Sequence, residues 1–264
     1  MSPPQSKTSF IGRTALLRRL EALYRSGRHV LLTGPPGVGK SLLIAELMRT
    51  HPMPLAPRCN CLGELLAALE PAAGLDRGDL KLAARVHRLA RRLPQIGRPV
   101  VLDDVARVPP RVAHLVRYLL IRQPVWLLAR STQPLDIGHV WPYLFLFKRI
   151  ELPPFSLDET RAFLNAAPFS GNRSELIAAT LRLHRLAAGH PATLAALVAE
   201  LRCRTYDLHS TEGLRLLALH VRITRVQAQI ACQPGLTSAP GRRRRIAAPV
   251  PRAETGRAAR SATP

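Results

Sequence analysis

Acidic residues are scarce in this sequence of 264 residues, which has 17 aspartates and glutamates against 39 lysines and arginines. The formal net charge at pH 7 is therefore +22. Seven arginines and one glutamate lie between Gly235 and Pro264, so most of this charge belongs to the rest of the chain. A strongly basic surface attracts polyanions such as nucleic acid. An arginine-rich composition is equally expected of a GC-rich genome, so both interpretations stay open.

Cysteine is also rare, and the four cysteines do not have the spacing of a recurring zinc site. Cys59 and Cys61 form a C-x-C pair, whereas Cys203 and Cys232 lie far along the chain. Zinc sites usually combine two close pairs of ligands. We therefore expect reduced, structural cysteines in a cytosolic protein.

Long hydrophobic runs are absent, although 47% of the residues are hydrophobic. No run approaches the roughly 20 apolar residues that a membrane-spanning helix needs. The first residues, Met1 to Lys7, are polar and lack the apolar core of a secretory signal. The composition predicts a folded protein that is soluble and cytoplasmic, with no membrane partner.

Short apolar runs that alternate with amphipathic segments dominate the first part of the chain. Such runs are typical of buried parallel strands, and amphipathic segments between them are typical of crossover helices. The expected strands are residues 29–33, 55–59, 99–103, 125–129 and 145–152, and the expected helices are residues 14–24, 41–49, 62–70, 79–93 and 111–121. The pattern predicts an α/β fold with a doubly wound parallel sheet.

Helices alone are expected after residue 152. Ser156 and Glu159 have the spacing of a capping box. A second helix is expected over residues 174–188, before Gly189, and a third begins at Pro191, which suits a first helical turn. A fourth is expected over residues 211–232. We predict three parts: an α/β domain over residues 1–152, a small helical lid over residues 153–233, and a basic disordered tail over residues 234–264.

The expected helix over residues 79–93 combines an apolar stripe with a basic one. The basic stripe consists of cationic residues that recur every third or fourth position along the helix: Lys81, Arg85, Arg88 and Arg92. A row of cations on a helix is most often a solvated face. Contact with nucleic acid is the alternative interpretation.

A glycine-rich segment follows the first expected strand and precedes a helix. It matches the pattern G-x-x-x-x-G-K-[ST] at every fixed position and consists of Gly34, Pro35, Pro36, Gly37, Val38, Gly39, Lys40 and Ser41. Glycines allow backbone N–H groups to wrap a phosphate chain, and the helix N-terminus adds its positive dipole end. The pattern predicts a P-loop that binds ATP. Lys40 would reach the β- and γ-phosphates, and the Ser41 hydroxyl would ligate Mg²⁺.

Two adjacent carboxylates end a later apolar strand, which reads Val-Val-Leu-Asp-Asp from residue 100. Asp103 is expected to hold Mg²⁺ through the water shell of the ion. Asp104 is expected to orient the attacking water, which must be aligned with the γ-phosphate. Because aspartate is one methylene shorter than glutamate, hydrolysis is expected to be slow.

Taken together, these motifs resemble those of the STAND and AAA+ branches of P-loop ATPases. Five landmarks occur in the family order: Phe10-Ile11-Gly12-Arg13, the P-loop (Walker A), Val100–Val105 (Walker B), Val125–Ser131 and Gly189-His190-Pro191. The linker from Leu152 to Glu159 is similar as well. The resemblance covers about residues 10–201.

The resemblance implies further residues of the nucleotide site. Ile11, Gly12 and Arg13 would lie against adenine, Arg130 would sense the γ-phosphate, and Pro191 would pack near the nucleotide from the helical lid. Each has a simpler interpretation, since a turn before a helix, a strand-end arginine and a helix-start proline are all common. No winged-helix, repeat or effector module is visible after the lid, and no arginine finger is identifiable.

The leading hypothesis is therefore an ATP- and Mg²⁺-dependent switch that hydrolyses ATP to ADP and phosphate. Lys40, Asp104 and Arg130 would be its catalytic residues, and self-association could complete the site. One alternative is a DNA-associated AAA+ helper ATPase, which the basic surface and Arg242–Arg245 suggest. Another is a nucleotide-binding module without turnover.

Overall fold

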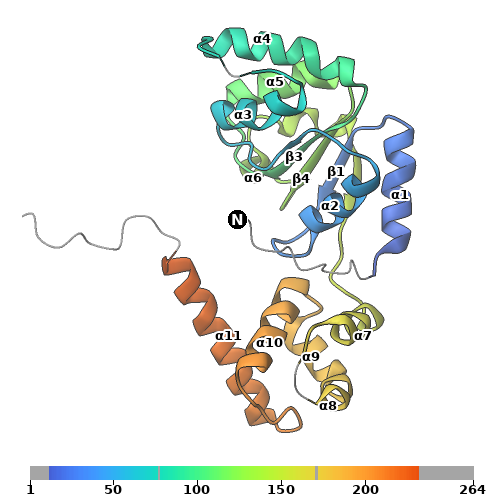
Figure 1. Cartoon of the computed structure of the whole chain (residues 1–264), viewed down its shortest axis with the longest axis vertical. Helices are drawn as coiled ribbons and strands as arrows, with labels where there is room; N and C mark the ends of the chain where they lie inside the picture. Colours follow the sequence, from blue (N-terminus) through green and yellow to red (C-terminus); the bar gives the residue numbers. More distant parts are fainter. Residues whose placement is uncertain (1–11, 77, 170–171, 232–264) are drawn as a thin grey trace, which may run out of the picture. The chain divides into compact units, whose positions relative to one another are not determined.

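The computed structural model describes residues 12–76, 78–169 and 172–231 (Figure 1). Five strands form one parallel sheet: β1 (Val30–Thr33), β2 (Leu55–Ala56), β3 (Val100–Val105), β4 (Val125–Ala129) and β5 (Lys148–Glu151). Their order in the sheet is β2-β3-β4-β1-β5. The α/β fold with a parallel sheet is therefore confirmed. β1 lies between β4 and β5, so the chain must cross β4 and β3 to form β2 at the far edge.

Helices cover both faces of the sheet because successive strand residues point to opposite sides. Leu31 and Leu127 face a core that is covered by α3 (Leu62–Ala72), α4 (Leu82–Arg92) and α5 (Pro110–Leu120). Leu32 and Leu128, one position along, face α1 (Thr14–Arg25) and α2 (Lys40–Thr50). The central strands β1 and β4 are apolar and buried because neither face meets water, whereas the edge strand β5 exposes Lys148, Arg149 and Glu151.

The segment after β5 forms helices with an apolar core of their own. They are α7 (Leu157–Ala166), α8 (Arg173–Ala178), α9 (Thr180–Ala187), α10 (Pro191–Cys203) and α11 (Thr211–Ala231). The core of this part is drawn only from residues after Leu152. The predicted capping box is present, because the Ser156 hydroxyl accepts from the Glu159 N–H and the Glu159 carboxylate accepts from the Ser156 N–H.

The chain divides into two units, one up to Arg222 and one from Ile223 onward. The boundary that we predict between residues 152 and 153 is not tested by this division and stays a prediction. The predicted tail over residues 234–264 lies outside the described residues. None of the described helices is long and apolar enough to cross a membrane.

Three predicted elements differ from the structure. The expected strand over residues 145–152 begins only at Lys148, because a 3-10 helix, η2 (Trp141–Leu146), with Pro142 in its first turn, occupies the start. The edge strand β2 stops at Ala56, and Pro57 follows, which lacks an N–H to donate. The expected helix over residues 174–188 is broken at Ala179, where the Thr180 hydroxyl donates to the Ile177 carbonyl in competition with the helical pattern.

Further short elements complete the first part of the chain. A 3-10 turn, η1 (Leu93–Ile96), extends α4, and a short helix, α6 (Pro134–Ile137), follows β4. α4 begins at Leu82 rather than at residue 79. α11 ends among the described residues at Ala231, and Cys232, the predicted last residue, lies outside them.

A buried ion pair joins α4 to α3, and it contradicts part of the predicted basic stripe. Arg85 donates from Nε and Nη2 to the two carboxylate oxygens of Glu70, at 2.8 and 2.7 Å, and both residues are buried. The helix turns Arg85 toward α3, so this arginine is not part of a solvated face. Its charge is compensated inside the protein.

Replacing Glu70 by alanine is expected to lower the free energy of unfolding by about 3–5 kcal/mol, because Arg85 would stay buried without a counter-charge. Glu46→Ala is the control, since Glu46 pairs with the largely exposed Arg49, and its cost is expected to stay below about 1 kcal/mol. Urea unfolding followed by circular dichroism measures both. Equal losses for the two variants would contradict the structural role of the buried pair.

Candidate nucleotide-binding site

The glycine-rich loop lies at the carboxyl end of β1, and α2 begins directly after it at Lys40. In open parallel sheets, ligands bind beyond the carboxyl ends of the strands, where successive connections run to opposite sides. β1 lies at such a point, because its neighbours in the sheet are β4 on one side and β5 on the other. The fold thus places the predicted P-loop where a phosphate chain is expected to bind.

Three glycines of the loop have left-handed backbone angles, with φ of 149° at Gly34, 79° at Gly37 and 101° at Gly39. A Cβ at Gly34 would lie 2.9 Å from the carbonyl oxygen of Leu152. Side chains rarely adopt these angles, so glycine is required here by both conformation and space. Pro35 and Pro36 are exposed on the loop, whereas the Val38 side chain is fully buried in the core below it.

Lys40 is almost completely buried, with 9% of its surface exposed. Its Nζ donates to the carbonyl of Gly34 at 2.8 Å and to the carbonyl of Pro35 at 3.1 Å. Burial lowers the pKa of the Lys40 ammonium below its usual value, and the negative charge of Asp103 opposes this effect. The ammonium is therefore positioned by the loop itself. Ser41 lies beside it, exposed in the first turn of α2.

The two aspartates of β3 lie at a bulge. Leu102 pairs with Leu127 and Val105 pairs with Ala129, so β3 contains one more residue than β4 over this stretch. Asp104 takes a left-handed φ of 45°, and its N–H donates to the Asp103 carboxylate at 2.7 Å. Bulges re-aim side chains next to functional sites. This local backbone change could not be predicted from the strand pattern.

Arg130, which directly follows β4, forms an ion pair with Asp104 at 2.9 Å. The side chains of both residues are about half exposed, at 57% and 47%. Exposed pairs of this kind contribute at most about 1 kcal/mol. Asp103, Arg130 and Asp104 all influence the pKa of Lys40, so the four predicted charges are brought together at one edge of the sheet.

Cys59 lies next to Asp103, although its sequence pattern indicates no role at this site. Its Sγ donates to the backbone carbonyl of Asp103 at 3.4 Å. Burial raises the pKa of the Cys59 thiol to about 12, and the charges of Asp103 and Asp104 act in the same direction. Cys59 therefore supports the strand end as a neutral thiol.

Arg13 connects the loop to the linker that follows β5. Its Nη1 donates to the Val38 carbonyl and its Nη2 to the Pro153 carbonyl, each at 2.7 Å. The guanidinium also lies 4.8 Å from the ring centre of Phe155. Burial lowers the pKa of Arg13, and Glu159 opposes this effect. Of its two predicted partners at adenine, Gly12 has a φ of 76°, and Ile11 lies outside the described residues.

The start of α10 contacts the loop at Gly37. The N–H of Ala192 donates to the Gly37 carbonyl at 3.2 Å. A Cβ at Gly37 would lie 2.8 Å from the Ala192 Cβ and 2.9 Å from Cε1 of His190. Pro191 is the first residue of α10, as predicted, but its neighbours make these contacts. His190 is the central residue of the Gly189-His190-Pro191 element, and its sequence pattern indicates no role at the site.

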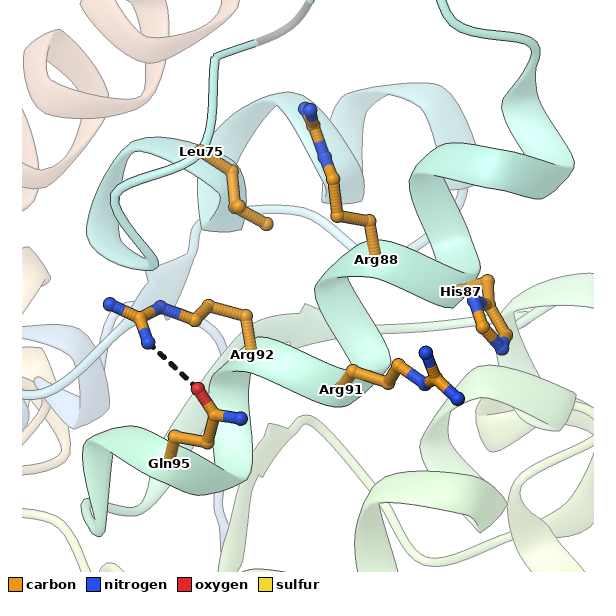
Figure 2. A pocket seen from close by; sticks show the side chains of 6 residues that line it. All are labelled: Leu75, His87, Arg88, Arg91, Arg92 and Gln95. Atoms are coloured by element: carbon orange, nitrogen blue, oxygen red, sulfur yellow. Dashed lines mark hydrogen bonds between the residues drawn. The ribbon is translucent and has the colours of Figure 1, made fainter.

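Arg88 and Arg92 of the predicted stripe line a pocket of about 290 Å³ on α4, together with Arg91, which lies outside that stripe (Figure 2). Arg92 donates to the Gln95 side chain at 2.7 Å, while Arg91 extends away from it toward His87. Arg88 donates to the backbone carbonyl of Asp76. The arginine side chains diverge, and Arg88 and Arg92 each bind a neighbouring group, so this face does not present the continuous basic row that the spacing predicts.

Cys59 is expected to resist alkylation by iodoacetamide at pH 8, because its raised pKa keeps the reactive thiolate scarce and its side chain is buried. Cys61 and Cys203 are exposed and serve as internal controls. Peptide mass spectrometry over time measures each rate, and denaturant is expected to equalise them. Modification of Cys59 as fast as Cys61 in the folded protein would contradict the buried position.

Gly37→Ala is expected to destabilise the protein by roughly 1–3 kcal/mol, through its positive φ and its clash with Ala192. Gly74→Ala is the matched control, because Gly74 has a φ of 64° but no atom within 4 Å of the added Cβ. If the contact with α10 is real, Gly37→Ala with Ala192→Gly costs less than the two changes separately. Additive costs in thermal unfolding would argue against it.

Comparison with known proteins agrees with this arrangement. Residues 9–128 match the family model described as AAA ATPase domain. The structure resembles a Walker-type ATPase of Pyrococcus abyssi, with 17% identity, a TM-score of 0.57, and coverage of 88% of this chain and 77% of that one. It also resembles Cdc6p from Pyrobaculum aerophilum, with 14% identity, a TM-score of 0.54, and coverage of 76% and 64%.

A third similar structure is a signal transduction ATPase with numerous domains (STAND) and a tetratricopeptide repeat sensor from Pyrococcus horikoshii. The identity is 16% and the TM-score 0.50, and the match covers 81% of this chain but 32% of that one. At these identities the three structures support the fold alone. Residues 9–128 of this chain thus resemble an AAA ATPase domain, and the fold agrees with that resemblance.

Proposed function

We propose that this protein is an ATP-dependent switch that hydrolyses ATP slowly to ADP and phosphate. The observation that carries the proposal is the meeting of four charges at one sheet edge. Lys40 is nearly buried in the glycine loop, and its pKa is influenced by the two aspartates of β3 and by Arg130. A preorganised set of charges beside a phosphate-binding loop is what phosphoryl transfer requires.

The loop fits a triphosphate chain. Lys40 is bound by the Gly34 and Pro35 carbonyls, so its ammonium is held at the loop by neutral backbone groups. When ATP binds, the same ammonium would contact the β- and γ-phosphates, and the N–H groups at the start of α2 would face them. Lys40 would then exchange its bonds to the loop carbonyls for bonds to phosphate oxygens.

The Ser41 hydroxyl and the Asp103 carboxylate would hold Mg²⁺. Both offer oxygen atoms, which are the ligands that this ion prefers. Both also belong to elements that end or begin at the same sheet edge. Bound Mg²⁺ would neutralise charge that develops on the phosphate oxygens.

Asp104 would orient the attacking water, but its carboxylate is paired with Arg130. Because this pair is exposed and weak, the γ-phosphate would attract Arg130 and release the Asp104 carboxylate for water. Asp104 also has a shorter side chain than glutamate would have. Both features support slow turnover.

The switch would act through the contacts between the loop and the helices after β5. Arg13 joins the Val38 carbonyl to the Pro153 carbonyl, and Ala192 joins α10 to the Gly37 carbonyl. A nucleotide that changes the loop would change these contacts, because ligand binding favours the conformation that it fits best. His190 and Pro191, beside Ala192, would sense the same change.

A nucleotide-binding module without turnover is the second candidate. The ion pair between Asp104 and Arg130 favours it specifically, because a carboxylate that stays paired would not orient water. Nucleic-acid association has less support in α4, where Arg85 pairs with Glu70 and where Arg88 and Arg92 bind nearby groups.

Steady-state phosphate release from ATP and Mg²⁺ tests the proposal. Lys40→Ala and Asp104→Asn are each expected to lower kcat by about 10²-fold or more, since each removes a group needed for the charge or the water of the transition state. Binding of a fluorescent ATP analogue is expected to be lost only in Lys40→Ala. Release is measured over a range of protein concentrations, because a rise in specific activity reports self-association.

Lys148→Ala is the matched control, because Lys148 is exposed at the opposite, amino-terminal end of β5. This variant is expected to keep wild-type turnover. If wild type binds the analogue but releases no more phosphate than Asp104→Asn, the enzymatic proposal is wrong and the binding module stands. If wild type does not bind the analogue, both candidates fail.

A further inference from the structure

His190 lies at the place where the helices after β5 meet the glycine loop. It directly precedes α10 and is half-buried. If Gly37 had a Cβ, that atom would lie 2.9 Å from Cε1 of His190 and 3.7 Å from its Nε2. The edge of the imidazole that carries these two atoms therefore faces Gly37, in the middle of the loop. Glycine at position 37 leaves free the space that this edge needs.

The backbone is fixed on both sides of His190. On one side, the Gly189 carbonyl accepts from the Phe155 N–H at 2.8 Å, and a Cβ at Gly189 would lie 2.5 Å from the Phe155 carbonyl oxygen. On the other side, the Ala192 N–H donates to the Gly37 carbonyl at 3.2 Å. The fold thus sets the position of the imidazole before any ligand binds, which is what a preorganised binding group requires.

The two ring nitrogens of His190 have different surroundings. Nδ1 lies 3.5 Å from Oγ1 of Thr193, whose hydroxyl can donate to it. A neutral ring that accepts at Nδ1 carries its proton on Nε2. No residue that the structure describes forms a hydrogen bond with Nε2. Nε2 is also not among the buried side-chain atoms without a partner in the described ranges. It is therefore an accessible N–H donor beside the loop.

The chemistry of the loop defines the ligand that would meet this donor. Lys40 brings a positive charge to the loop, and the start of α2 adds backbone N–H groups. Such an environment binds a phosphate chain. A further N–H donor at its edge fits a phosphate oxygen, because hydrogen bonds to charged acceptors are the strong ones. The alternative is a ring that only fills the space above Gly37, and such a role needs no nitrogen.

We propose that Nε2–H of His190 donates to a phosphate oxygen of the bound nucleotide. The glycine loop and the residue before α10 would then bind the same phosphate chain. This inference rests on the proposed nucleotide site but does not require hydrolysis. It gives the proposed switch a contact that exists only with nucleotide, in addition to the permanent bond between Ala192 and Gly37.

Two substitutions separate the donor from the ring. His190→Phe keeps a ring without a donor, and His190→Gln keeps a side-chain N–H without a ring. The full-length chain is titrated with ATP, ADP and inorganic tripolyphosphate, each of which displaces a fluorescent ATP analogue. His190→Phe is expected to weaken binding at least about tenfold, whereas His190→Gln is expected to stay within about threefold of wild type.

The three ligands locate the contact. Tripolyphosphate has neither base nor ribose, so its weaker binding to His190→Phe would support a phosphate contact directly. Equal losses for ATP and ADP would place the contact on the phosphates that both contain. A loss for ATP and tripolyphosphate without one for ADP would place it on the γ-phosphate.

His209→Phe is the matched control, because His209 is exposed and lies outside the site. This variant is expected to bind like wild type, and circular dichroism establishes which variants fold. His190→Ala removes the ring and the donor together and is expected to bind as weakly as His190→Phe. It replaces that variant in the comparison with His190→Gln if the phenylalanine prevents folding.

The outcomes separate this inference from the proposed function. Wild-type affinity in both His190→Phe and His190→Ala would overturn the inference and leave the proposed nucleotide site intact. Binding by His190→Gln as weak as that of His190→Ala would assign the ring to packing and would also overturn it. Wild type that binds neither the analogue nor tripolyphosphate would overturn the proposed function, and this inference with it.

Discussion

The parallel sheet is the constraint on which the site depends. Because every strand points the same way, the carboxyl ends of β1, β3 and β4 meet at one edge. Lys40, Asp104 and Arg130 are far apart in sequence, but each lies at or just after one of these ends. Their charges are then close enough to influence one another.

The loop holds its cation before any ligand is present. Lys40 loses hydration as it is buried, and two loop carbonyls replace that water. Carbonyl groups are weaker partners than phosphate oxygens, so a triphosphate would compete well for the ammonium. The γ-phosphate would likewise compete with Asp104 for Arg130, because an exposed carboxylate is displaced from its ion pair more easily than a buried one.

Sequence reasoning predicted the features that depend on residue type and period. The glycine loop, the parallel sheet and the Ser156–Glu159 capping box belong to this group. It missed features that depend on where a helix turns a particular side chain. Arg85 occupies a basic stripe in sequence, but the helix directs it to Glu70 across a buried interface. The bulge at Asp104 and the approach of Ala192 to Gly37 likewise depend on backbone geometry.

The many arginines have different physical roles, so net charge alone is a poor guide to partners. Arg85 is neutralised by a buried carboxylate, and Arg13 is held by two backbone carbonyls. Neither offers its charge to a polyanion. Arg215 and Arg222 differ, because they are exposed on a helix that has almost no acid.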